Sequence, residues 1–179
     1  MLSAAIVGFV LSVLTLIAAE IYIAARGGDL LSLSALLKLL LLILVADLAN
    51  TAMIFFITSF FESNNAFSTA STIIGTLIGF VTGIYLPIGV LPGGVQWIVR
   101  LFPTSHAAAL MRQVMMEAPM AESFEGVPVP QTQHVEEMLG VHFWFGGKEL
   151  SGGMNLLILL CFGILFFGLA AANLSRKSD

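Results

Sequence analysis

This sequence is poor in charged residues and almost free of cysteine. Only 10% of its 179 residues are charged, as 7 basic and 11 acidic side chains, whereas an average soluble domain has roughly 25%. The formal charge of −4 is mild and provides no basic surface, so we expect no nucleic-acid partner. The single cysteine, Cys161, lies in an apolar run, which excludes a disulfide framework or a cysteine-based metal site within one chain.

Apolar residues are abundant instead and make up 58% of the chain. A soluble protein of this length cannot bury so much apolar surface, so lipid must solvate much of it. A membrane-spanning helix needs about 20 apolar residues. Four runs meet this need, at about 4–25, 33–61, 66–86 and 154–174. We therefore predict an all-α integral membrane protein with residues 1–179 in a single transmembrane domain.

The segment between the third and fourth runs is apolar but broken by Pro87, Pro92 and Pro103. Proline cannot continue a helix interior, and neither resulting piece is long enough to span. Broken backbone at membrane depth is tolerated where it packs on protein or lines a wet cavity. We predict a re-entrant or interfacial helical hairpin at 92–116, followed by a polar outer loop at 117–151.

The first two runs contain three charged residues and one asparagine. Asp47 lies near the middle of the second run with Asn50 one turn later, and such residues mark either a translocation pathway or a hydrogen-bonded anchor between helices. Glu20 and Lys38 flank the turn near residue 29 at equal distance. If the two runs form an antiparallel hairpin, these charges lie at one depth and form an ion pair, or Lys38 extends to the headgroups alone.

Three glycines, Gly75, Gly79 and Gly83, repeat every four residues in the third run. On a continuous helix they share one face, where a second backbone can approach closely. We predict a helix-packing seam, within the chain or between chains. The alternatives are a hinge, or simply the high frequency of glycine in membrane helices.

No cluster of residues predicts catalysis. His134, Glu137 and His142 do not have the spacing of a zinc motif, and no nucleophile lies beside a base in any known pattern. We therefore predict no catalytic residue, no metal and no cofactor bound by this chain. A four-span scaffold or assembly subunit that transports nothing remains an alternative.

From Ser63 to Arg112 the sequence resembles the C-terminal half of permeases of the type-2 ATP-binding-cassette (ABC) exporter family. In that family a span ends in a Gly-x-x-x-Pro element and a Leu-Pro pair follows. A short outer helical hairpin with an internal proline precedes the last span. The residues that carry the resemblance are Gly83-Ile84-Tyr85-Leu86-Pro87, Leu91-Pro92, Val95-Gln96-Trp97-Ile98, Phe102-Pro103 and Arg112.

The resemblance implies a permease subunit in the cell membrane, with both termini cytoplasmic. Such permeases have six spans, of which this chain would supply the last four and lack the two N-terminal ones, as a fragment or as half of a split permease. Members pair with a second permease copy or half and with separate ABC subunits that bind ATP. They export drugs, lipids, polysaccharides or peptides by alternating access, so multidrug efflux is one expected activity. Trp97 would be an interface anchor of the outer hairpin.

Overall fold

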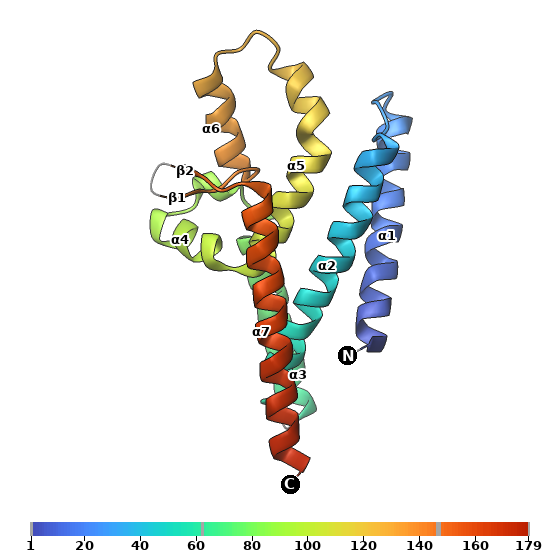
Figure 1. The fold of residues 1–179 in the computed structure, drawn as a ribbon, viewed down its shortest axis with the longest axis vertical. Coiled ribbons are helices and arrows are strands. Elements are labelled where there is room, and N and C mark those ends of the chain that lie inside the picture. Colours follow the sequence, from blue (N-terminus) through green and yellow to red (C-terminus); the bar gives the residue numbers. More distant parts are fainter. Residues whose placement is uncertain (1, 62, 146–147, 179) are drawn as a thin grey trace.

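The computed structural model describes residues 2–61, 63–145 and 148–178 as an elongated, almost entirely helical molecule (Figure 1). The prediction of an all-α integral membrane protein is confirmed. In chain order the elements are α1 (Leu2–Ala25), α2 (Leu33–Thr58), α3 (Asn64–Val81), the 3₁₀ turn η1 (Ile88–Val90), α4 (Gly93–Leu101), α5 (Pro103–Ser123), α6 (Val129–Leu139), β1 (Trp144–Phe145), β2 (Lys148–Glu149) and α7 (Gly152–Ser178).

Three helices of the described ranges are long and apolar enough to cross a membrane: α1, α2 and the Gly152–Asn173 part of α7. The third expected span is not among them. Helix α3 has 18 residues, or about 27 Å at 1.5 Å per residue, and it begins with two asparagines. It ends at Val81 because Gly83 adopts a left-handed conformation with φ +73°, which terminates a helix. The expected boundary at residue 86 was therefore too late.

Helix α2 is the centre of the bundle and packs against α1, α5 and α7. Its buried alanines Ala46 and Ala49 form a core with Ala107 of α5 and Leu159 of α7. At Gly163 of α7 an added Cβ would lie 3.1 Å from the Cβ of Ala49. Small residues thus let α2 and α7 approach closely, as is typical of membrane helices.

We call residues 87–151, between α3 and α7, the outer segment. It contains the expected pair of helices, α4 and α5, which meet at Phe102 and Pro103. Proline is well placed at the first position of α5 because its missing N–H has no partner there. The expected hairpin end at 116 and the polar loop at 117–151 were wrong in detail. Helix α5 continues through Pro119 to Ser123, and α6 and the β1–β2 hairpin fill most of the remainder. In Figure 1, α5 and α6 form an arch at one end of the molecule.

Candidate functional site

Three consecutive polar residues open α5 and join the outer segment to the rest of the chain. The hydroxyl of Thr104 donates to Asn50 Oδ1 of α2 at 2.9 Å, and that of Ser105 donates to the carbonyl of Val81 in α3 at 2.9 Å. All three residues of this turn are buried. We call Thr104, Ser105 and His106, with their partners, the junction.

His106 is fully buried at the centre of the junction. Its Nδ1 lies 2.6 Å from Asn155 Oδ1 of α7, and its Nε2 lies 2.9 Å from the carbonyl of Arg100 in α4. Asn155, also fully buried, turns its amide nitrogen toward two carbonyls. The imidazole therefore ties α4 and α7 to the start of α5.

Sequence reasoning did not single out these residues. The signal was present, because three polar side chains follow Pro103 directly within an apolar stretch. Buried polar groups require partners, and here the partners come from four different helices.

Arg112 forms a second contact between the outer segment and the end of α3. Its Nη2 donates to the carbonyl of Thr82, and its Nη1 is buried with no hydrogen-bond partner among the described residues. Burial lowers the pKa of Arg112. The guanidinium lies beside two left-handed glycines, Gly83 and Gly140, and an added Cβ at either would come within 3.5 Å of it. Glycine at both turns therefore leaves room for the arginine.

The structure places two of the three predicted glycines, Gly75 and Gly79, in α3, and a packing seam with a second chain stays a prediction. Gly83 lies outside α3, and Gly75 has no neighbour within 4 Å of an added Cβ. Only Gly79 is closely approached, by the ring of Tyr85. A seam on α3 within the chain is thus not observed, and the close helix contact is between α2 and α7 instead.

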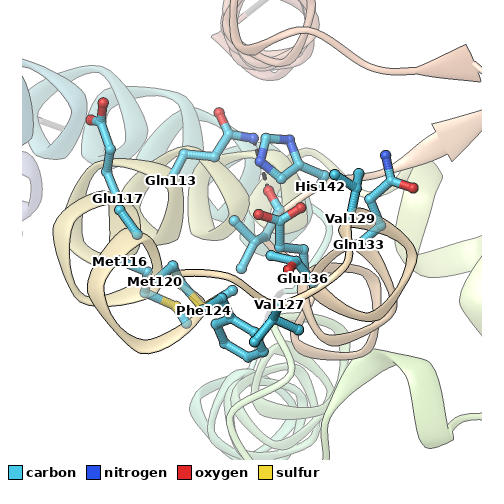
Figure 2. Close-up of a pocket in the computed structure, with 13 residues that line it drawn as sticks. Gln113, Met116, Glu117, Met120, Phe124, Val127, Val129, Gln133, Glu136 and His142 are labelled. Carbon is cyan, nitrogen blue, oxygen red and sulfur yellow. Dashed lines mark hydrogen bonds between the residues drawn. The ribbon is translucent and has the colours of Figure 1, made fainter.

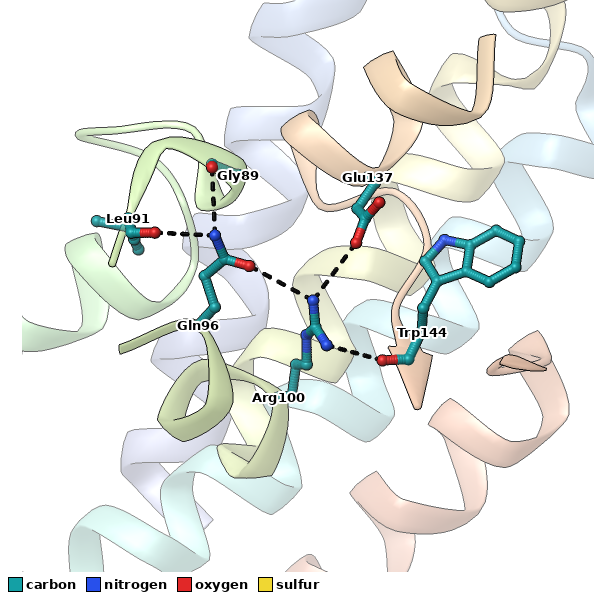
Figure 3. A network of polar contacts seen from close by, with 6 residues as sticks. All are labelled: Gly89, Leu91, Gln96, Arg100, Glu137 and Trp144. Carbon is teal, nitrogen blue, oxygen red and sulfur yellow. Dashed lines mark hydrogen bonds and ion pairs between the residues drawn. The ribbon is translucent and has the colours of Figure 1, made fainter. Parts of the chain in front are cut away.

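Arg100 connects α4 to α6 and β1, as Figure 3 shows. Its Nη1 donates to the carbonyl of Trp144 at 2.8 Å, and its Nη2 lies 3.5 Å from the Glu137 carboxylate. Gln96, which accepts from Arg100, donates to the carbonyl of Leu91 at 2.8 Å. The exposed ion pair adds little stability, whereas the bonds to backbone carbonyls fix the orientation of α4.

The prolines of the outer segment stand at element boundaries. Pro87 precedes η1 and Pro92 precedes α4, whereas Pro103 is the first residue of α5. Trp97 of α4 is exposed, so its role as an interface anchor stays a prediction.

Asp47 and Asn50 are separated by one turn of α2 but have different neighbours. Asn50 belongs to the junction. Asp47 faces α1, where an added Cβ at Gly8 would clash with its Oδ1, and its Oδ2 is buried with no hydrogen-bond partner in the described part of the chain. Glycine at position 8 therefore makes room for the carboxylate.

The predicted ion pair between Glu20 and Lys38 is not formed. Glu20 Oε2 accepts a hydrogen bond from the backbone N–H of Leu31 at 3.1 Å, in the loop that joins α1 to α2. Lys38 is exposed. The two ion pairs found in the described residues, Arg100 with Glu137 and His142 with Glu149, lie elsewhere.

Comparison with known proteins identifies the family. The model of the family described as "ABC-2 family transporter protein" matches residues 1–172, which include the spanning helices, the junction and the outer segment. The chain belongs to the ABC-2 transporter family.

Among curated proteins, this ABC-2 family chain is similar to Nodulation protein J of Rhizobium meliloti (strain 1021), with 24% identity over 143 residues. The aligned region covers 80% of this chain and 44% of that protein, so the chain spans less than half the length of its curated relative. No solved structure matches it. The junction residues of α5 and Arg112 thus lie in a region that the family model covers.

Proposed function

We propose that this chain is a membrane permease subunit of an ABC-type exporter and moves its substrate by alternating access, driven by a separate ATPase subunit. The observation that carries the proposal is the family match over residues 1–172. The order of elements supports it, since two spans, a shorter helix, an outer segment and a last span follow one another.

The junction suggests how the helices would move together. Switching between inward-open and outward-open states needs elements that move as rigid bodies about packed interfaces. Hydrogen bonds from one turn of α5 reach α2, α3 and α7. A displacement of the spans would therefore be transmitted to the outer segment through Thr104, Ser105 and His106.

A cavity of about 440 Å³ between α1, α2 and α3 is our candidate for part of the substrate path. It is lined by Ala4, Asn50, Thr51, Ile54, Phe55, Thr58 and Phe67. Of the two polar residues of α2, Asn50 is therefore the stronger candidate for the substrate path, because Asp47 does not line this cavity. A mostly apolar lining with a few polar groups is typical of ligand sites and suits an amphipathic substrate.

The proposed partners are an ABC subunit that binds ATP and a second permease copy or half. We propose that the shorter α3 also crosses the membrane, as a fourth span, so that both termini lie in the cytoplasm. Arg176 and Lys177 follow the last span, and basic residues favour that side. Export is the proposed direction, and drug efflux is the first activity to test.

The test is purification from native membranes through a C-terminal tag, in mild detergent, with intact masses measured for every component. Recovery of a nucleotide-binding ATPase, and ATP hydrolysis that is lost when its catalytic carboxylate is removed, would support the proposal. Recovery of the tagged chain without any ATPase, under conditions that keep a known ABC exporter of the same membrane intact, would contradict it and favour a scaffold.

A further inference from the structure

A second cavity lies in the arch, apart from the spans and the junction. It has a volume of about 670 Å³ and is enclosed by the second half of α5, the connection to α6, and α6 itself. Cavities of roughly 300–1,000 Å³ are the usual size for small-molecule sites. Its lining combines apolar and acidic side chains (Figure 2).

One wall is apolar and adaptable. Met116 and Met120 of α5 contribute thioether side chains, and Phe124 and Val127 continue the same wall. Methionine is flexible and polarisable and makes favourable contacts with aromatic groups, so this wall can accept apolar bodies of different shapes. Phe124 adds a ring face that attracts cations.

Two carboxylates from different helices are among the lining residues: Glu117 lies on α5 next to Met116 and is exposed, and Glu136 lies on α6 and is partly buried. Neither carboxylate makes a hydrogen bond or ion pair with any other residue that the structure describes. Of the described lining residues, none is a lysine or an arginine. His142 Nδ1 lies 2.6 Å from Glu149 Oε1, so the carboxylate that this ring nitrogen contacts is neither Glu117 nor Glu136.

We propose that this cavity binds a small organic cation with an apolar body, such as an aromatic or alkyl ammonium compound. The apolar body packs against Met116, Met120 and Phe124, and the cationic group lies at Glu136, with the exposed Glu117 adding negative charge nearby. Opposite charge favours binding, and it does so more strongly at the partly buried Glu136 than in bulk water. An anion of the same shape meets like charge and is rejected. The proposal does not depend on transport, because it concerns equilibrium binding to the outer segment.

The test uses the full chain in lipid nanodiscs and two probes of similar shape and opposite charge, benzyltrimethylammonium and phenylmethanesulfonate. Isothermal titration calorimetry measures saturable binding of each. We expect the cation to bind and the anion not to bind. The double variant Glu117→Gln and Glu136→Gln is expected to weaken cation binding by about tenfold. The control Glu122→Gln, on α5 but outside the lining, should leave binding unchanged within about twofold.

A further variant separates loss of the site from loss of the fold. Met120→Ala should weaken binding of the cation by a few-fold, by about the value of the lost apolar contact, and leave the melting temperature of the protein near the wild-type value because the side chain is only partly buried. Absence of saturable cation binding to the wild type would overturn the proposal. Equal binding of both probes, or full binding by the double carboxylate variant, would overturn it as well.

Discussion

Replacement of His106 by alanine is expected to destabilise the protein more than any exposed histidine replacement. The change removes two contacts of a fully buried ring, to Asn155 Oδ1 and to the carbonyl of Arg100. Each buried acceptor left without a donor costs about 1–3 kcal/mol. Loss of both gives a central value of about 4 kcal/mol, which lowers the melting temperature of a chain of this size by roughly 8–16 °C.

The assay is thermal unfolding of the purified chain in detergent, followed by circular dichroism. His134→Ala is the matched control, because His134 is exposed and its loss should change the stability by no more than about 0.5 kcal/mol. His106→Asn and His106→Gln each place an amide nitrogen near one of the two ring nitrogens. Each should recover part of the loss.

Equal melting temperatures for His106→Ala and His134→Ala would refute the reasoning. A second result would also refute it: an alanine variant as stable as the wild type, with His106→Asn and His106→Gln both destabilised. The hydrogen bonds of the ring would then contribute nothing, and only the size of the side chain would matter.

Three further changes test the packing of the spans, all by the same unfolding assay. Gly163→Leu is expected to force α7 away from α2 and to cost about 1–3 kcal/mol, whereas Gly168→Leu, with no neighbour within 4 Å, should be neutral; equal effects would contradict the close contact. Gly79→Ala meets an aromatic ring and should destabilise by about 1–2 kcal/mol, while Gly75→Ala should be neutral or slightly stabilising. Asn50→Leu removes the acceptor for the first turn of α5 and should cost about 0.6–1.7 kcal/mol; no change would mean that the bond is replaced by water.

The sequence predicted the long helices well because their hydropathy signal is local. It also predicted the interruption at Pro103, because proline acts on its own turn. The end of α3 was missed, since Gly83 is a permissive residue whose left-handed conformation depends on what packs around it. The structure places Ile88 and Arg112 beside that glycine, and both come from later segments.

The candidate site was harder to predict because its partners are distant in sequence. Thr104 and its partner Asn50 are 54 residues apart in the sequence, and His106 and Asn155 are 49 residues apart. The periodicity of residues within one helix cannot predict such pairs. The predicted pair of Glu20 and Lys38 failed for the opposite reason. An equal number of residues from the turn places Glu20 and Lys38 at a similar depth in the membrane. The Glu20 carboxylate nevertheless accepts a hydrogen bond from the backbone N–H of Leu31, which is nearer in the structure.

Fixing α5 at its first turn gives it the mechanics of a lever. From His106 to Ser123 the helix extends for about 26 Å at 1.5 Å per residue. It packs against α2 and α7, and beyond the junction Arg112 and Gln113 donate hydrogen bonds to the carbonyls of Thr82 and Val141. A tilt of about 10° at the pivot would move the far tip by roughly 4–5 Å over that length. An angular change too small to disturb the packing of the spans would thus become an ångström-scale displacement at the top of the arch.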